Sequence, residues 1–417
     1  MSTLEEESEE EVLAGEGEGS SAALTTPARL GGYVRRGHRM LVPIVTVVIA
    51  FVAGGFVVLL TGHNPLSTYK AIFNGTGLQW LFPWVTGNAR TLAAFNLQQT
   101  LITTTPYILV GLAVAFAFRA GLFNIGGQGQ YTVGGIVAVW IGSSFASMSP
   151  FLHIVLAIAA AGLAGAAWAG IAGILKAALG VNEVISTIML NWIAIWGGVY
   201  LFGLGGPLQD PHQPDVPVSS TIVSSAHLPV FWGNAALQGL HIGLFIALAG
   251  AVVFWVVLSR TRLGYEVRAV GLNPDAAGYA GISVAKNYFR AMAICGAFAG
   301  VAASLDILGW KFNLFTNDIQ FSTIGFIGIA VALLGQNTAI GTVFAALLFG
   351  ALQTGTSDRF LDPSVFDPKL ASNLTWMIQG LIVLLVSTDL IALRVLQSGR
   401  GFRVMFKRRA KREEVSA

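Results

Sequence analysis

The chain has 417 residues, of which 54% are hydrophobic and only 11% are charged, and its mean hydropathy is +0.69. A soluble globular protein carries about 25% charged residues, so this chain has too few charges to cover a surface that faces water. The composition argues against a soluble enzyme, which the length alone would permit. It predicts an all-α, polytopic membrane protein.

The charges concentrate at the two ends of the chain. Eight of the 21 acidic residues are glutamates between Glu5 and Glu18, and eight of the 24 basic residues lie between Arg394 and Arg412. Residues 1–32 are rich in Glu, Gly and Ser, which predicts a disordered acidic tail. We expect residues 33–395 to form the transmembrane domain and residues 396–417 to form a basic tail.

Ten apolar segments follow one another between the tails, and each is expected to form a transmembrane helix, because about 20 apolar residues cross ~30 Å of hydrocarbon. They cover residues 40–60, 96–118, 126–147, 151–175, 183–203, 240–259, 288–309, 320–335, 338–356 and 374–394. Segment 320–335 is short, which leaves nine or eleven spans open. The connections 61–95, 204–239 and 357–373 carry turn signals and prolines that predict loops.

Lysine and arginine divide unevenly between the two sides of this arrangement. If the N-terminus lies inside, ten spans place 19 of these residues in the cytoplasm and five outside. This is the distribution that the positive-inside rule requires. We therefore expect a multi-pass protein of the bacterial cytoplasmic membrane with both termini in the cytoplasm.

Small residues indicate how the spans pack. Glycine and alanine occupy nearly every face of segment 151–175, and Gly296 and Gly300 form a GxxxG pair in segment 288–309. Because small residues let helix backbones approach closely in lipid, we interpret both features as packing surfaces and not as ligand sites.

The first stretch with polar and helix-breaking residues at membrane depth runs from Arg119 to Gln130. It contains four glycines within nine residues, which disfavours a continuous helix. Non-helical backbone inside a bilayer is tolerated where it is buried in protein or lines a watery cavity. We expect Phe123, Asn124, Gln128 and Gln130 to belong to a solute pathway, where amides serve a neutral polar solute. A cytoplasmic turn between two spans is the alternative.

The second stretch begins segment 183–203. Asn182 is expected to cap the helix, and Glu183, Thr187 and Asn191 follow at i, i+4 and i+8, so they form a polar stripe on one face. We assign this stripe and the adjacent Trp192 to the pathway as well. An acid inside a membrane is a functional hypothesis by default, but Glu183 at a helix start also fits a simple capping charge.

The third stretch is the loop 260–287, which the charge count places in the cytoplasm. Asn273 as N-cap and Pro274 at the first helical position predict the start of a helix, and Gly281 predicts its end. A helix of about two turns with such definite signals suits a groove on a partner protein.

Several motifs of soluble enzymes are missing from the sequence. It has no GxxxxGK[ST] loop, no HExxH and no GxSxG, and its six histidines are scattered around a single cysteine, Cys295. We therefore expect no ATP hydrolysis by this chain itself, no metal site and no cofactor.

Three motifs in order resemble those of permease subunits of bacterial ABC importers. The motifs are Gly121–Gly126 followed by Gln128, Gly129 and Gln130, then Asn182–Asn191, then Gly264–Pro274. The resemblance is to the nucleoside and simple-sugar branch, which is related to the ribose and branched-chain amino acid permeases, and it covers about residues 40–395. Gln128 is a departure, because members of this branch often carry Ala-Glu before Gly-Gln.

The resemblance implies an ABC importer permease fold and a set of partners. Two permease chains, identical or different, would form the pathway, and an extracellular or lipoprotein solute-binding protein would deliver solute. Two cytoplasmic ATP-binding subunits would use the ATP and dock on the coupling loop 260–287. The residues assigned to that coupling are Glu266, Arg268, Asn273, Pro274, Asp275, Gly278 and Gly281. Paired half-repeats are also implied, with polar Gly-rich segments at 121–130 and around 322–328.

The function expected from these features is uptake of a nucleoside or a related neutral polar solute, because the spans are rich in amides and nearly free of charge. A sugar permease is the nearest alternative. An ion-coupled secondary transporter would need buried acids, and Glu183, Asp306 and Asp389 all lie near span ends. A membrane-embedded enzyme is disfavoured by the lack of any nucleophile–base pair. Beyond proteins and lipid, we expect no nucleic acid polymer as a partner.

Overall fold

The computed structural model describes residues 28–234, 238–357, 360 and 367–387. Its contacts divide the chain into a compact unit of residues 47–391 and a second unit of residues 1–46 and 392–417. The described part of the second unit is the start of helix α2 (Ala28–Leu60). Residues 28–32, which the sequence places in the disordered tail, form the first turn of α2 instead, since Ala, Arg and Leu favour helix. The rest of the acidic tail, the basic tail and Asp389 lie outside the described residues.

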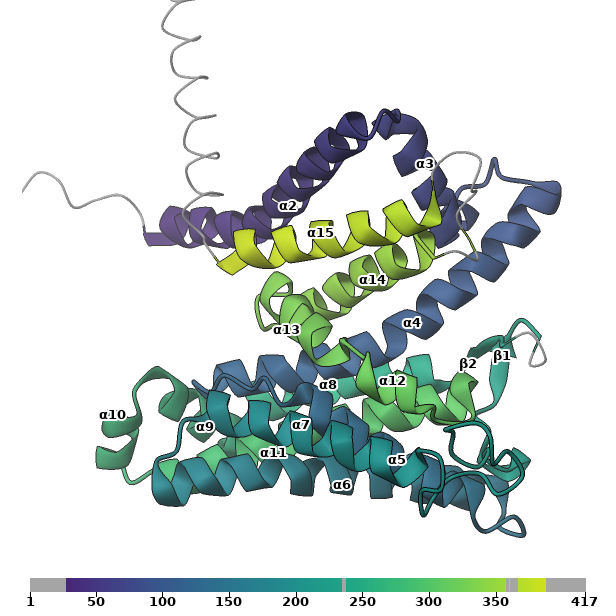
Figure 1. Ribbon diagram of the computed structural model, residues 1–417. Helices are drawn as coiled ribbons and strands as arrows, with labels where there is room; N and C mark the ends of the chain where they lie inside the picture. The colour runs from purple at the N-terminus through teal and green to yellow at the C-terminus, as the bar shows by residue number, and fades with distance from the viewer. Residues whose placement is uncertain (1–27, 235–237, 358–359, 361–366, 388–417) are drawn as a thin grey trace, which may run out of the picture. The chain divides into compact units, whose positions relative to one another are not determined.

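The compact unit consists almost entirely of helices (Figure 1). After α2 come α3 (Pro65–Thr76), the 3₁₀ turn η1 (Leu78–Leu81), α4 (Gly87–Arg119), α5 (Gly127–Ser143), α6 (Pro150–Leu179) and α7 (Glu183–Phe202). An irregular segment then holds η2 (Ser224–Ala226) and two antiparallel strands, β1 (Val230–Trp232) and β2 (Leu240–His241). The remainder is α8 (Gly243–Arg260), α9 (Arg262–Leu272), α10 (Pro274–Tyr279), α11 (Val284–Asp306), the π-helical turn η4 (Ile307–Lys311), α12 (Thr316–Gln320), α13 (Ile324–Leu334), α14 (Ala339–Gly355) and α15 (Pro368–Ser387).

Each of the ten predicted spans overlaps a helix, which confirms the all-α class. Seven helices in the described residues are long and apolar enough to cross a membrane: α2, α4, α6, α7, α8, α11 with η4, and α15. The other three predicted spans correspond to α5, α13 and α14, which have 17, 11 and 17 residues. Segment 320–335 is not one helix, because the chain breaks at residues 321–323 between α12 and α13.

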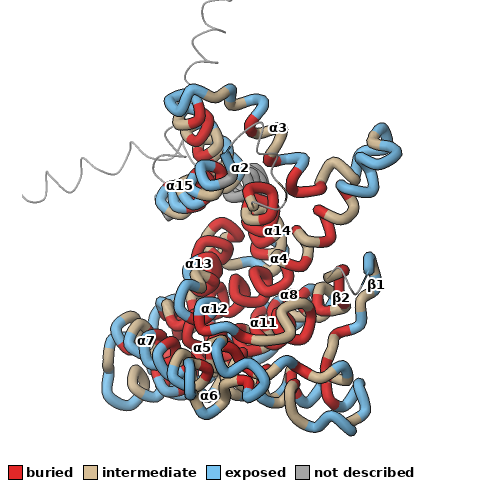
Figure 2. The backbone as a smooth tube through the Cα atoms, turned by 45° about the vertical axis from the view of Figure 1, so that its right-hand side comes forward, coloured by how far each residue is buried: buried red, intermediate tan, exposed pale blue. Residues whose placement is uncertain are grey.

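Helix α4 is the centre of the compact unit. It packs against α11, α14, α13 and α8, and 83% of its most apolar stretch is buried (Figure 2). Its 33 residues make it about 50 Å long, which exceeds the hydrocarbon thickness of ~30 Å. The extra length lies at its beginning, where Gly87–Phe95 were expected to belong to a loop.

The contact between α6 and α11 joins backbone to backbone. A Cβ added at Gly296 would lie 2.0 Å from the Gly165 carbonyl oxygen, and one added at Gly300 would lie 2.1 Å from the Ala161 carbonyl oxygen. Only glycine fits at these two positions, so the packing role predicted for the GxxxG pair and for segment 151–175 is confirmed.

The connection 204–239 and the loop 260–287 lie at opposite ends of this helical unit. Segment 204–239 is irregular, as predicted, apart from η2 and β1, and it folds onto the end of α11. Ile222 N donates to Phe312 O and Leu228 N to Leu308 O, both at 2.8 Å. The other end carries α9 and α10. Helix α10 confirms the short helix predicted after Asn273, whereas α9 is a helix that the sequence analysis did not identify.

Candidate functional site

The first turns of α5 and α13 lie beside each other on α4. Gly325 N donates to Gln128 Oε1 at 3.3 Å, and a Cβ at Gly328 would meet Val110 Cγ1 at 2.5 Å. Val110 is nine residues from Arg119, which is about 13 Å along the helix and nearly half of the ~30 Å hydrocarbon layer. With the end of α4 taken as the membrane surface, two short helices begin next to each other near the middle of the hydrocarbon layer.

The loop 120–126 connects the end of α4 to this meeting point and is held by its own amides. Asn124 and Gln130 form a reciprocal pair, with Nδ2 to Oε1 at 3.2 Å and Nε2 to Oδ1 at 3.1 Å, and Gly126 N donates to Asn124 Oδ1 at 2.8 Å. Gly121 begins the loop with φ +72°, which favours glycine. Because these hydrogen bonds satisfy the side-chain amides of Asn124 and Gln130, they stabilise the non-helical backbone of the loop.

Helix α7 completes this arrangement through the polar stripe predicted on it. Asn191 Oδ1 accepts from Gly129 N at 2.7 Å, and Asn191 Nδ2 donates to Ile125 O at 3.0 Å. A Cβ at Gly126 would lie 3.0 Å from the Thr187 Cβ, so α7 and the loop are in direct contact. The side chain of Asn191 thus replaces hydrogen bonds that a continuous helix would have made in the loop.

Glu183 lies at the start of α7 and joins three elements. Its carboxylate pairs with Lys176 Nζ at 2.9 Å and accepts from Phe123 N at 3.5 Å, and Asn182 caps the helix by accepting from Val184 N at 2.9 Å. The carboxylate is therefore both a charge near the helix N-terminus and a structural link from α6 to the loop 120–126.

The structure thus brings together six of the eight residues assigned to the pathway: Asn124, Gln128, Gln130, Glu183, Thr187 and Asn191. The side chains of Phe123 and Trp192 lie outside that network, and the two residues are 40% and 53% exposed, although Phe123 N donates to Glu183. Gln128 Nε2 is buried and has no hydrogen-bond partner among the described residues.

The coupling residues lie on α9, α10 and the turn that follows. Asn273 Oδ1 accepts from Ala276 N at 3.0 Å, which caps α10, with Pro274 and Asp275 in its first turn. Gly278 lies within α10, and Gly281 ends it with φ +80°. Glu266 and Arg268 are in α9, where the Arg268 Nε donates to the Gly264 carbonyl oxygen.

Glu266 ties α9 to the beginning of α11. It accepts hydrogen bonds from Asn287 Nδ2 at 3.3 Å and Arg262 Nε at 3.0 Å, and Arg290 Nη1 is 3.6 Å away. The hydrogen bonds from Asn287 and Arg262, with the charges of Arg262 and Arg290, lower the pKa of the Glu266 carboxyl below its ordinary value. Glu266 therefore stays ionised and holds α9 in place.

Two further residues at this end were missed by the sequence analysis. Leu272 and Tyr279 are 88% and 95% exposed, on either side of the Asn273 cap. Large apolar side chains that project fully into water on a rigid loop are typical of contact sites. Their position in an otherwise polar loop was the signal that could have identified them.

A second polar cluster, also missed, surrounds Asp306 at the end of α11. Its carboxylate accepts from Tyr131 on α5 and from Trp310 Nε1 at 2.5 Å, and it pairs with Lys311 Nζ at 2.7 Å. The last two residues belong to the π-helical turn η4, a rare element that is frequent at functional sites. The sequence placed Lys311 outside and gave Asp306 no partner, because a five-residue separation does not suggest contact in an α-helix.

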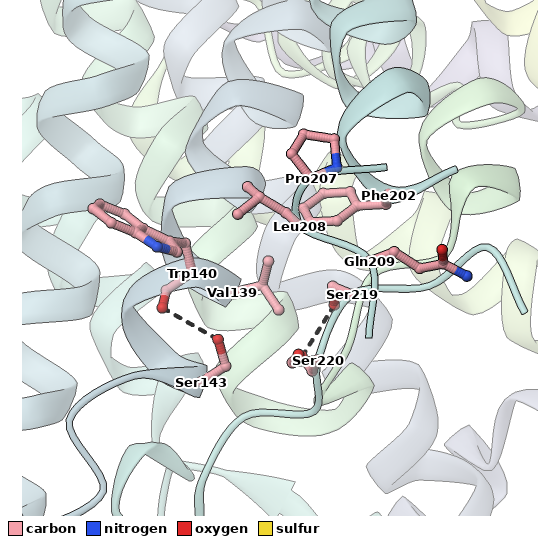
Figure 3. A pocket seen from close by; sticks show the side chains of 9 residues that line it. All are labelled: Val139, Trp140, Ser143, Phe202, Pro207, Leu208, Gln209, Ser219 and Ser220. Atoms are coloured by element: carbon pink, nitrogen blue, oxygen red, sulfur yellow. Dashed lines mark hydrogen bonds between the residues drawn. The ribbon is translucent and has the colours of Figure 1, made fainter. Parts of the chain in front are cut away.

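A pocket in the described residues is at the same end as this cluster. It lies between the ends of α5 and α7 and the segment 207–220 (Figure 3). Trp140 and Phe202 line it from the helices, and Gln209, Ser219 and Ser220 from the segment. None of the predicted pathway residues contributes to it.

Comparisons with known proteins bear on this arrangement. A family described as branched-chain amino acid transport system / permease component matches residues 96–387. The guanosine ABC transporter permease protein NupP of Bacillus subtilis (strain 168) is 39% identical over 358 residues, which are 85% of this chain and 95% of the relative. The nucleoside ABC transporter permease protein NupB of Lactococcus lactis subsp. cremoris (strain MG1363) is 36% identical, over 76% of this chain and 84% of the relative.

Other relatives are more distant. The glucose ABC transporter permease protein TsgB13 of Haloferax volcanii is 32% identical, over 83% of this chain and 87% of the relative. A second guanosine permease protein of the same Bacillus subtilis strain, NupQ, is 28% identical, over 61% of this chain and 79% of the relative. No solved structure matches the chain.

The family match covers about two thirds of the chain, including the loop 120–126, the polar stripe of α7, the coupling segment and the Asp306 cluster. Together with relatives that align over most of their length, it shows that this multi-pass membrane protein belongs to the family of permease components of ABC transport systems.

Proposed function

We propose that the chain is one transmembrane subunit of an ATP-driven importer that takes up a purine nucleoside or a closely similar solute. The observation that carries this proposal is the 39% identity to a guanosine permease over 95% of that protein. The interior supports it, because the buried polar side chains in and around the loop 120–126 are uncharged, among them the amides of Asn124, Gln128, Gln130 and Asn191, which suit an uncharged solute.

The α9–α10 end would face the cytoplasm and carry the ATP-binding subunits. In the compact unit this end bears Lys176, Arg262, Arg268, Lys286 and Arg290, in keeping with the positive-inside rule. The Asn273 cap and the Glu266 cluster make the segment rigid, so a displacement of α10 by an ATP-binding subunit would be transmitted into α11.

The proposed role of the amide network is to support the pathway where it passes the middle of the membrane. The loop 120–126 and the first turns of α5 and α13 are the breaks in helical structure there, and such breaks are where transporters place solute sites. The buried Gln128 Nε2 has a hydrogen to offer once the helices separate. Phe123 and Trp192 would contribute from the exposed side of the same elements.

The second permease of the complex is proposed to be a different chain. One organism carries both NupP, at 39% identity, and NupQ, at 28% identity, each named as a guanosine permease. This chain is closer to the first kind, so its partner would be of the second kind. A solute-binding protein would deliver solute at the end that bears the pocket in Figure 3.

A sugar is the second candidate solute, and the 32% identity to a glucose permease favours it. The two candidates share a ring with several hydroxyl groups. They differ in the base, which only a nucleoside carries.

The proposal is tested by uptake of radiolabelled guanosine and glucose into cells that lack nucleoside transporters and express the chain with its neighbouring transporter genes. We expect guanosine uptake that is lost when the catalytic glutamate of the ATP-binding subunit is replaced. Glucose uptake without guanosine uptake would assign the sugar instead. Uptake of either solute by the chain alone, driven by an ion gradient, would overturn the importer assignment.

A further inference from the structure

The segment between α11 and α13 has an exposed face that the assigned pathway residues do not include. Helix α12 buries Thr316 and Ile319 and exposes Asn317, Asp318 and Gln320. Phe315 before the helix and Phe321 after it are exposed as well, Phe321 to 72%. One face therefore offers a carboxylate and two amides between two aromatic rings.

This face cannot lie against lipid. A carboxylate and two amides exposed to hydrocarbon would each carry a large cost in free energy. The depth of the segment follows from its neighbours: Phe315 forms a β-bridge with Val218 of the outer connection, and α13 begins near the middle of the membrane beside Gln128. Helix α12 thus occupies the half of the membrane opposite the α9–α10 end, on a surface that faces water or another protein chain and not lipid.

The segment is also held rigidly. Leu314 N donates to Ser219 Oγ at 2.9 Å and Thr316 N to Pro217 O at 3.1 Å, and a Cβ at Gly198 of α7 would lie 2.9 Å from Ile319 Cδ1. A side chain on such a supported element keeps its position, as recognition of a small solute requires.

Asp318 is the charged group of this face with acceptor capacity to spare. Its only hydrogen bond among the described residues is a long one from Phe315 N, at 3.4 Å. Asp306, by contrast, is fully engaged by Tyr131, Trp310 and Lys311. Asp318 and Lys311 also line a small, mainly apolar hollow against Tyr131 and Thr132 of α5, while Asp318 itself is exposed.

We propose that the exposed face of α12 is a solute-contact site in the outer half of the pathway, where Asp318 accepts hydrogen bonds from the vicinal hydroxyls of a nucleoside sugar and Phe321 stacks on its base. A carboxylate that receives ribose hydroxyls and an aromatic ring on a nucleobase are general pairings. This inference rests on the proposed function, and it specifies which part of the solute each side chain recognises.

The test compares uptake of guanosine with uptake of 2′,3′-dideoxyguanosine, which lacks both hydroxyls, in cells that express the complete transporter. The solute-binding protein is the same in every strain, so a change in the ratio of the two uptake rates comes from this chain. We expect Asp318→Asn to lower the preference for guanosine about tenfold, the effect of losing a charge-assisted hydrogen bond. Asp215→Asn, an exposed carboxylate on the outer connection, should leave the ratio unchanged.

The stacking role proposed for Phe321 is tested separately, with its own control variant. Phe321→Leu should lower the uptake of both nucleosides several-fold and Phe321→Trp should restore it, since any flat ring can stack. Phe344→Leu on α14, which is exposed to a similar degree at 67%, should have no effect.

Three outcomes would overturn the site. Unchanged uptake of both solutes in Asp318→Asn would show that the carboxylate does not recognise the hydroxyls. An equal loss of both solutes in that variant would instead indicate that the face packs against the second permease. If the unaltered transporter takes up no nucleoside at all, the proposed function fails and this inference with it, whereas guanosine uptake with an unchanged ratio removes only the α12 site.

Discussion

Asp306 determines the local structure at the C-terminal end of α11, because three side chains from two elements converge on its carboxylate. A buried ion pair gains little over apolar packing, but removing one partner leaves an uncompensated charge. The Asp306–Lys311 pair therefore determines which residues come into contact, and it contributes little to the net free energy of folding. Tyr131 links this cluster to α5, three residues after Gln128.

We expect Lys311→Ala to destabilise the protein by about 3–5 kcal/mol, the usual cost of leaving a buried carboxylate unpaired. Thermal unfolding in detergent measures it, with Lys286→Ala, an exposed lysine of the same helix, as the control. The double variant Asp306→Asn/Lys311→Met should recover part of the loss, because no charge is left unpaired. Equal melting temperatures for the two lysine variants would contradict the role of the pair.

His241 gives the outer end a dependence on pH. Gly243 N donates to its Nδ1 at 3.1 Å, and the ring lies against the backbone of Gly309. Burial lowers the pKa of His241 to about 4, whereas an unfolded histidine titrates near 6.5. Between these values the unfolded chain binds the extra proton, so stability is complete above about pH 6.5 and falls as the pH drops toward 4.

The expected result is a melting temperature that falls between pH 7 and pH 5 by more in the unaltered protein than in His241→Asn. Asparagine keeps an acceptor for Gly243 N but does not titrate. His212→Asn, at an exposed histidine of the neighbouring segment, should retain the full pH dependence. Identical pH profiles for the unaltered protein and His241→Asn would rule out this group as the source.

At the scale of elements, the packing of α11 depends on positions where no side chain fits. Gly300 lies between two helices, because its own Cβ would meet Ala161 on α6 and a Cβ at Gly134 on α5 would lie 2.5 Å from its Cα. Three backbones approach one another at this point. Van der Waals contact of this kind is a main source of helix association in lipid.

We expect Gly300→Ala to push these helices apart and to lower stability by about 1–3 kcal/mol, as overpacking does. Gly197 is the matched control, since a Cβ there meets nothing within 4 Å and alanine favours helix by up to about 1 kcal/mol. Thermal unfolding of the two single variants gives the comparison. A stable Gly300→Ala would mean that α5, α6 and α11 can separate freely.

The helices themselves were predictable, because hydropathy reports directly on burial in lipid. Short-range signals were equally reliable: Asn182 and Asn273 cap the helices expected of them. The short α5 was not distinguishable from a full span, since an apolar run does not reveal where a helix begins within it. Segment 320–335 was recognised as short, but the break between α12 and α13 was not predicted. Helix α9 was missed because its glycines and charged residues are typical of a loop. Its position also depends on contacts that Glu266 makes with Asn287 and Arg290 of α11.

The candidate site divides in the same way. The stripe of Glu183, Thr187 and Asn191 follows from helical spacing alone, and the structure places it against the loop 120–126. Its partners could not be predicted, because Asn191 bonds to residues more than 60 positions away. The Asp306 cluster and the exposed face of α12 depend on a π-helical turn and a break at 321–323, neither of which has a sequence signature.

For the molecule as a whole, the two ends of the compact unit differ in their surfaces. One end carries the pocket of Figure 3 and the long connection 204–239. The opposite end carries α9 and α10, where charged residues surround exposed apolar ones. In the proposed importer, the ATP-binding subunits would need a firm contact at that end, because force would pass through it.

That contact is predicted to depend on Leu272 and Tyr279, which flank α10. Large exposed side chains on a rigid element are the residue types that dominate protein interfaces. We expect Tyr279→Ser to abolish or strongly reduce guanosine uptake and to lower the amount of ATP-binding subunit that co-purifies with the permease by tenfold or more. The chain should still insert and melt normally, since Tyr279 makes little contact within it.

Two further variants serve as controls for this prediction. Trp84→Ser changes a side chain that is 72% exposed at the opposite end of the molecule, and it should leave both co-purification and uptake intact. Gly281→Val would strain a backbone with φ +80° and so distort α10 itself, which should weaken the complex by a different route, with a lower melting temperature. Normal uptake and normal co-purification in Tyr279→Ser would show that the ATP-binding subunits engage some other surface, and α10 would lose its assignment as the element that transmits their motion.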